Sequence, residues 1–393
     1  MTAQVLPPPP PTASQEALSF GMVAGEASGD LLASLLIRGL RTRWPRLQGW
    51  GIGGPRMVAE GFEAQWPSER LAVRGYFEVL RHYRGIVAIR DQLREHLLAQ
   101  PPQLFIGVDA PDFNLDLEAS LKARGVPTVH MVCPSIWAWR AERIHKIRRS
   151  VDHMLCIFPF EVELLAREGV AATYVGHPLA PVIPREPDRA GARSRLQLQQ
   201  DAPVVALLPG SRRSEIEHMT PRLLAAARLM QKKRPELQFV LPAVPALVSQ
   251  VQTLCERTPL PGLRVLQGQS HEALAACDLT LIASGTATLE AALFKRPMVI
   301  GYHMNVLSWW IMRRQRLQPW VGLPNILCGE FVVPELLQDA CTPERLAFEG
   351  LSWLDDPLRV QALTERFSVL HEQLTRDTAQ EAVRAIEKTL QSA

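Results

Sequence analysis

The sequence predicts an α/β protein built from two parallel-sheet domains that face a central cleft. Short apolar runs alternate with helical patterns along both halves of the 393-residue chain, which is typical of buried parallel strands joined by crossover helices. Two turns of small residues, at 25–30 and 283–290, each follow such a run and precede a helical pattern. Because turns of this kind let ligand atoms approach the backbone, one in each half favours a ligand crevice shared by two domains.

The first domain is expected at residues 18–180, after a disordered proline-rich tail at 1–17. The prolines at 7–11 occupy the place of a signal peptide's apolar core, so we expect no export. The strands predicted in this half are residues 18–24, 104–109, 128–133, 154–158 and 172–175.

The second domain is expected at residues 181–360, and its charged, proline-bearing start at 181–195 is the best candidate for a linker. Helical patterns occupy 221–233 and 290–294. We expect helices over 361–393, with an apolar face along 377–390, that either pack back on the first domain or are swapped between subunits. The strands predicted in this half are residues 203–208, 237–241, 263–266, 279–283 and 297–301.

Composition excludes several classes of protein. A formal net charge of +3 is too small to argue for nucleic-acid binding. The six cysteines include no CxxC pair and the ten histidines no HExxH, so we expect reduced thiols in the cytosol and neither zinc nor another cofactor. Apolar residues make up 47% of the chain, but no run reaches the roughly 18 residues of a membrane span.

The turn Ser-Gly-Thr-Ala-Thr-Leu-Glu at 284–290 is a candidate site for a nucleoside diphosphate. Its hydroxyls and backbone N–H groups can ligate phosphate, and Glu290 can accept hydrogen bonds from both hydroxyls of a ribose. The alternative makes Ser284 a helix cap and Glu290 a carboxylate that complements the helix dipole. Gln269, in an upstream turn, could face a base. The candidate contacts within 284–290 are Ser284, Gly285, Thr286, Thr288 and Glu290.

A second strand-to-loop turn, Pro-Gly-Ser-Arg-Arg at 209–213, brings guanidinium groups to the same sheet edge. Arg212 can fork onto a phosphate while a leaving group gains charge, with Ser211 beside it. The alternative is a surface arginine paired with Glu215.

In the first half, Asp109 ends a predicted strand and Asp112 follows it. A carboxylate at this edge can serve as the general base for an attacking hydroxyl, and we assign that role to Asp109. The alternatives are a local turn before Pro111 and, for Asp112, a helix cap.

Three stretches combine aromatic or apolar residues with arginines, a composition suited to a membrane interface or an anionic headgroup. Core packing or a solvated helix face is the alternative for each. The candidate lipid contacts are Val73, Tyr76, Phe77, Trp137, Trp139, Arg140, Trp309, Trp310, Arg313 and Arg314.

Taken together, the motifs resemble the lipid-A-disaccharide synthase family over residues 18–340. Seven segments appear in family order, and although each is short, seven in register are specific. They lie at 25–30, 107–113, 134–140, 175–179, 208–212, 283–290 and 323–327.

The resemblance implies a GT-B fold with two Rossmann-like domains. It implies an inverting, metal-independent transfer of 2,3-diacylglucosamine from UDP-2,3-diacylglucosamine to 2,3-diacylglucosamine 1-phosphate, which gives a β-1,6 disaccharide and UDP. It makes Asp109 the base, the turns at 211–212 and 284–290 the donor site, and a homodimer on the inner face of the inner membrane the expected assembly. By the same resemblance, the acceptor side of the cleft takes Glu26, Ser28, Gly29, Asp30 and Asn325.

Two positions depart from the family pattern: His303 and Glu330 stand where arginines are common. If those arginines contact phosphate, this chain must use another cation, such as Arg313 or Arg314, or bind its ligands differently. Three alternatives stay open: a UDP-GlcNAc 2-epimerase-like isomerase of the same architecture, a transferase that uses another lipid-linked acceptor, and a non-catalytic nucleotide-binding or membrane scaffold.

Overall fold

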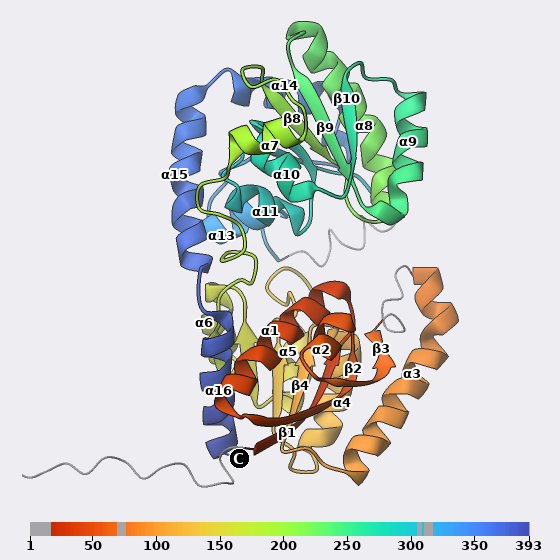
Figure 1. The fold of residues 1–393 in the computed structure, drawn as a ribbon, viewed down its shortest axis with the longest axis vertical. Helices are drawn as coiled ribbons and strands as arrows, with labels where there is room; N and C mark the ends of the chain where they lie inside the picture. Colours follow the sequence, from red (N-terminus) through yellow and green to blue (C-terminus); the bar gives the residue numbers. More distant parts are fainter. Residues whose placement is uncertain (1–16, 69–75, 305–308, 310–316, 393) are drawn as a thin grey trace, which may run out of the picture. The chain divides into compact units, whose positions relative to one another are not determined.

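The computed structural model describes residues 17–68, 76–304, 309 and 317–392, which form two compact units. The first unit comprises the chain up to Pro178 together with Arg376–Ala393, and the second comprises Leu179–Thr375. Each unit contains one parallel sheet covered by helices (Figure 1). No helix within the described ranges is long and apolar enough to cross a membrane.

The first unit has a seven-stranded sheet in the order β3-β2-β1-β4-β5-β6-β7. Its all-parallel register, for example Gly107 opposite His130, brings the carboxyl ends of the strands to one edge. The strands are β1 (Ala17–Ala24), β2 (Arg46–Gly53), β3 (Glu63–Pro67), β4 (Leu104–Val108), β5 (Thr128–Met131), β6 (His153–Cys156) and β7 (Ala172–Tyr174). The helices are α1 (Ala27–Arg43), α2 (Pro55–Ala59), α3 (Tyr76–Ala99), α4 (Pro111–Lys122), α5 (Arg143–Ser150), α6 (Pro159–Arg167) and α16 (Thr378–Ser392).

The second unit has a six-stranded sheet in the order β10-β9-β8-β11-β12-β13, also parallel. The strands are β8 (Val204–Leu208), β9 (Gln238–Ala243), β10 (Leu263–Gln267), β11 (Leu279–Ala283), β12 (Met298–Tyr302) and β13 (Glu335–Leu337). The α-helices are α7 (Arg189–Arg195), α8 (Arg213–Lys233), α9 (Val248–Arg257), α10 (Ser270–Ala276), α11 (Ala287–Leu293), α13 (Leu323–Cys328), α14 (Pro343–Leu354) and α15 (Pro357–Leu374). The short 3₁₀ helices are η3 (Pro245–Leu247) and η4 (Gln338–Ala340).

All ten predicted strands are present, and β2, β3 and β13 are additional. The candidate linker at 181–195 contains a helix, α7, that packs into the second unit. The Arg193 guanidinium on α7 is fully buried and pairs with Asp278 at 2.6 Å, while it also donates to the carbonyl of Ala276. The chain therefore changes units at Pro178–Leu179, before the charged stretch.

The last two helices belong to different units. α15 packs against α11 and α14 of the second unit, whereas α16 packs against α1 of the first. The apolar face of α16 enters the core of the first unit through Ala382, Val383, Ala385 and Ile386. The chain thus crosses between the units a second time, at Thr375–Arg376.

Candidate active site

Each sheet reverses its strand order once, between β1 and β4 in the first unit and between β8 and β11 in the second. The loops after the two strands at such a reversal diverge, so the carboxyl edge opens a crevice there. In the second unit this crevice is a pocket of about 490 Å³. It is lined by both predicted donor turns and by residues at or just after the ends of β9 and β10.

The loop after β8 is shaped by Glu215, whose carboxylate accepts hydrogen bonds from Ser211 N–H (3.0 Å) and Arg212 N–H (3.1 Å). Gly210 has φ of +113°, and a Cβ there would lie 2.5 Å from Glu215 Oε2, so only glycine fits. These two backbone donors are therefore occupied. The Arg212 side chain is 67% exposed, and its contact with Glu215 Oε1 is long, at 3.5 Å. Its guanidinium can therefore turn to a phosphate.

The turn after β11 presents part of the predicted set to the pocket. Ser284 N–H donates to the Gly301 carbonyl, and its hydroxyl lies half-buried, 3.4 Å from the Val321 carbonyl. Gly285 and Thr286 are exposed and line the pocket. Thr288 is turned inward instead: its hydroxyl is buried and donates to the Gly285 carbonyl at 2.7 Å, so it closes the turn rather than contacting a ligand.

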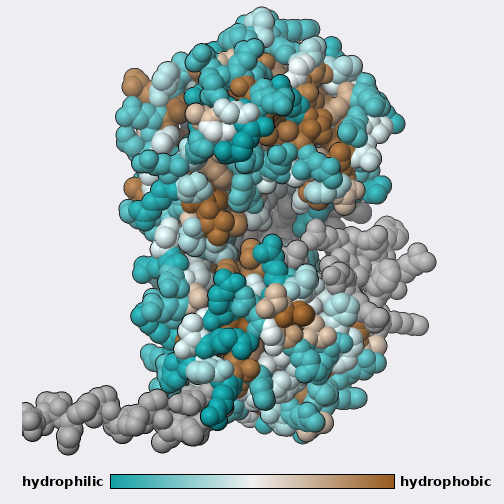
Figure 2. Space-filling model, in the orientation of Figure 1, coloured by the Kyte–Doolittle hydropathy of each residue, from teal (hydrophilic) through white to brown (hydrophobic). Residues whose placement is uncertain are grey.

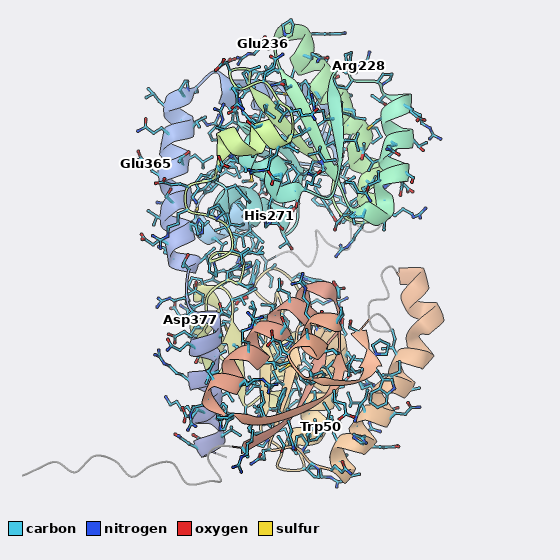
Figure 3. All side chains as sticks on the ribbon, in the orientation of Figure 1. Trp50, Arg228, Glu236, His271, Glu365 and Asp377 are labelled. Carbon is cyan, nitrogen blue, oxygen red and sulfur yellow. The ribbon has the colours of Figure 1, made fainter. Side chains whose placement is uncertain are left out.

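Glu290 lines the pocket, and His271 of α10 lies beside it (labelled in Figure 3), with Nε2 3.3 Å from Glu290 Oε2. The hydrogen bond to Glu290 raises the pKa of His271. Sequence reasoning missed His271 and also Tyr302, which lines the pocket from the end of β12. The one available signal for His271 was its place directly after the turn at 267–270. The predicted Gln269 has a left-handed backbone (φ +58°) and lies between two lining residues without lining the pocket itself.

In the first unit, Asp109 follows β4 at the strand reversal. Its backbone is left-handed (φ +52°), as is that of Ala110 (φ +44°). Asp109 N–H donates to the Met131 carbonyl at 2.9 Å, and its own carbonyl accepts from Asn114 Nδ2 at 2.8 Å. Both backbone groups are thus held, while the side chain is partly exposed at the carboxyl edge.

The turn after β1 lies against the end of β4. A Cβ on Gly29 would come within 3.7 Å of the Val108 carbonyl oxygen. Glu26 is half-buried and Ser28 is exposed, so both can meet a ligand. Asp30 differs from the prediction: its buried carboxylate is used to cap α2. It accepts from the N–H groups of Gly54, Arg56 and Met57 at 3.0–3.1 Å.

Asn325 also departs from the prediction. It is fully buried, and its Oδ1 accepts from the N–H groups of Val332 and Val333 at 2.8 and 2.9 Å. Its Nδ2 donates to the Val333 carbonyl and to Glu335. The amide therefore holds the loop between α13 and β13 together, and it does not line the pocket.

Of the predicted lipid contacts, Trp139 is 39% exposed and Arg140 is half-buried, with Arg140 Cζ 4.3 Å from the Trp139 ring centroid. Trp137 is buried instead, and its Nε1–H donates to Glu161 at 3.0 Å. Trp309 is half-buried. The view in Figure 2 shows a mainly hydrophilic described surface with scattered apolar side chains. Val73, Trp310, Arg313, Arg314 and the side chains of Tyr76 and Phe77 lie outside the described residues.

His303 and Glu330, which depart from the family pattern, each contact another side chain of the second unit. The ring of His303 packs edge-on against that of His218, with centroids 5.7 Å apart, and burial, together with the Arg222 charge, lowers the pKa of His303. His303 is therefore a neutral group near pH 7. Glu330 pairs with Arg366 of α15.

Two parallel α/β units, each with one strand reversal, define a protein of the GT-B fold class. The solved UDP-GlcNAc 2-epimerase from Neisseria meningitidis, bound to UDP-GlcNAc, is similar with a TM-score of 0.64. That match covers 96% of this chain and 100% of the other at 12% identity, which shows the fold alone.

The family comparison is more specific. The model of the family described as lipid-A-disaccharide synthetase matches residues 21–388. Relatives named lipid-A-disaccharide synthase from Albidiferax ferrireducens and Verminephrobacter eiseniae are 59% and 58% identical to this chain. They cover 95% and 96% of it, and the matches span 98% and 99% of the relatives. The chain belongs to the lipid-A-disaccharide synthase family and is a glycosyltransferase of lipid A biosynthesis.

Proposed function

We propose that the chain transfers 2,3-diacylglucosamine from UDP-2,3-diacylglucosamine to 2,3-diacylglucosamine 1-phosphate. The products are a β-1,6-linked disaccharide 1-phosphate and UDP. The family membership supports the reaction, and the pocket between β8 and β11 is the observation that carries the donor assignment.

In this proposal the uridine diphosphate occupies the 490 Å³ pocket of the second unit. Glu290 accepts hydrogen bonds from the ribose hydroxyls, and His271 orients that carboxylate through its 3.3 Å contact. The hydroxyls of Ser284 and Thr286 contact the diphosphate. Arg212, mostly exposed, binds the same group and stabilises the charge that develops as UDP leaves.

Asp109 acts as the general base. It takes the proton of the acceptor's 6-hydroxyl while that oxygen attacks C1 of the donor sugar from the face opposite UDP. The C1–oxygen bond to UDP breaks with its electron pair on the diphosphate, so the configuration at C1 inverts. The support for this role is the position of Asp109 at a strand reversal, with its backbone held on both sides and its carboxylate partly exposed. Glu26, Ser28 and Gly29, on the adjoining turn, are assigned to the acceptor.

We further propose that the enzyme works on the cytoplasmic face of the inner membrane as a homodimer. The exposed Trp139, with Arg140 and Arg143 on its ring, suits an anionic interface. The dimer rests on the family resemblance alone.

The test incubates the purified full chain with both diacylated substrates in detergent and follows UDP release and disaccharide formation. Formation of the disaccharide only when both substrates are present supports the proposal. UDP release that requires another acceptor, or solvent deuterium appearing at C2 of the sugar nucleotide without any acceptor, would overturn it in favour of the alternatives.

A further inference from the structure

A buried ionic cluster lies directly behind Asp109 in the first unit. Glu118 of α4 and His130 of β5 are both fully buried, and Glu118 Oε1 lies 2.7 Å from His130 Nδ1. Asn114 lies one turn before Glu118 on the same face of α4 and is also fully buried. A buried pair of this kind is costly to desolvate, and hydrophobic residues would serve stability as well.

The backbone is arranged to admit this cluster. A Cβ on Gly107, the strand residue opposite His130, would lie 2.1 Å from Glu118 Oε1 and 3.0 Å from His130 Nδ1. The carboxyl therefore occupies the space that a side chain of β4 would take. Asp109 comes two residues after Gly107, just past the end of β4.

Three buried atoms of the cluster have no hydrogen-bond partner among the described residues. They are Glu118 Oε2, His130 Nε2 and Asn114 Oδ1. Buried polar groups are almost always satisfied, and exceptions that gather at one place call for a functional explanation.

The cluster acts on Asp109 in two ways. Asn114 Nδ2 donates to the Asp109 carbonyl at 2.8 Å and so holds the left-handed turn. Burial alone would lower the pKa of His130, but the charge and hydrogen bond of Glu118 and the charge of Asp109 outweigh it and raise the pKa. Two other carboxylates of α4, Asp112 and Asp116, are paired with Arg143 and Lys146 of α5 and with Arg90 of α3. Those ion pairs span 2.6–2.8 Å.

We propose that Glu118 and His130 are positioning residues for the catalytic base: their ion pair of 2.7 Å, buried behind the end of β4, sets the electrostatic environment of the Asp109 carboxylate. Asn114 fixes the backbone that carries it. The inference rests on the proposed role of Asp109. It gives the buried pair a chemical function, because a base must be ionised to accept the acceptor's proton.

The kinetic test compares the pH dependence of kcat/KM in the wild type and in the double variant Glu118→Gln/His130→Gln. The double variant removes both charges, so it avoids the uncompensated buried charge of either single change. Without the His130 cation, the acidic limb should move up by about one pH unit. Activity should then fall about tenfold at pH values below the midpoint of the wild-type acidic limb and stay within about threefold of wild type at pH 9.

Glu161→Gln is the matched control. It also replaces a buried carboxyl of the first unit, one that Trp137 contacts, with an amide, and its acidic limb should coincide with that of the wild type. Variants are compared only where circular dichroism and thermal melting show an intact fold. An acidic limb in the folded double variant that coincides with the wild-type limb overturns the inference.

A second measurement does not depend on turnover. The His130 ring is titrated by NMR in the wild type and in Asp109→Asn, where removal of the Asp109 charge should move the midpoint of His130 to lower pH. An unchanged midpoint overturns the inference even in an active enzyme. If the wild type forms no disaccharide while the His130 midpoint still moves, the proposed reaction fails and the electrostatic coupling stands.

Discussion

The two strand reversals share one topology but place different chemistry at their carboxyl edges. At β8 and β11 the loops enclose a pocket of about 490 Å³, lined by exposed hydroxyls, by the largely exposed Arg212 and by Glu290. At β1 and β4 the loop residues Asp109 and Ala110 adopt left-handed backbone over a buried ion pair. Backbone strain of this kind costs roughly 1–3 kcal/mol per residue and is retained where its surroundings fix it. The edge at β8 and β11 thus carries a pocket, whereas the edge at β1 and β4 carries a partly exposed carboxylate on a held backbone.

The variant that should separate the roles of the two regions most strongly is Asp109→Asn. Loss of the base should lower kcat/KM by about 10³-fold, while UDP affinity measured by calorimetry stays at the wild-type value. Asp112→Asn is the control, because Asp112 is a neighbouring carboxylate that is 83% exposed and paired with Arg143. Turnover of Asp109→Asn above one-tenth of wild type would remove the carboxylate from the chemistry.

The second test concerns the binding crevice. Glu290→Gln should weaken UDP binding by about 30-fold, because a charged acceptor for the ribose hydroxyls is lost. The wild type should also prefer UDP to 2′-deoxy-UDP, and the variant should lose most of that preference. Glu272→Gln, on α10 and paired with Arg195, is the matched control. Equal preference for the two nucleotides in the wild type would contradict the ribose assignment.

A smaller effect is expected from Arg212→Lys, since an ammonium keeps the charge but loses the two-point contact with phosphate. We expect kcat to fall about tenfold, with the adjacent exposed Arg213→Lys near wild type. Steady-state kinetics with saturating donor separates the two variants, and matching values would place the leaving-group contact elsewhere.

The smallest effect is a pH dependence of stability in the first unit. Burial raises the pKa of Glu161 to about 8, although Trp137 and Phe158 donate to it. A carboxyl whose folded pKa is above its unfolded value stabilises the fold below about pH 4.5, and that contribution is lost as pH rises toward 8. The melting temperature should therefore fall between pH 5 and pH 8, and Glu161→Gln should reduce that fall by about 5 °C. An identical fall in the variant would show that other groups carry it.

The strands were predictable from sequence because buried parallel strands are short uninterrupted apolar runs. β2 escaped detection because three of its eight residues are glycines, which interrupt the apolar run. β13 has three residues and lies at an edge, where little apolar surface is needed.

The site was only partly predictable. Arg212, Ser284 and Glu290 were located by their turns, since turn position alone brings them to the pocket. Asp30 and Asn325 were assigned to ligands because they are polar residues within motifs. In the structure, Asp30 accepts hydrogen bonds from backbone N–H groups that are distant in sequence. Asn325 accepts them from N–H groups of a loop whose path the sequence does not reveal. Which donors need such a partner depends on the tertiary structure, so sequence patterns do not reveal it.

The return of α16 to the first unit has a consequence for synthesis of the chain on the ribosome. The core around α1 includes Ala382 and Ile386, which are translated only after the whole of the second unit. The first unit therefore cannot complete its packing until α16 has been made, whereas residues 179–375 are all available before α16 emerges. A nonsense mutation just before α16 would damage the unit whose synthesis began first.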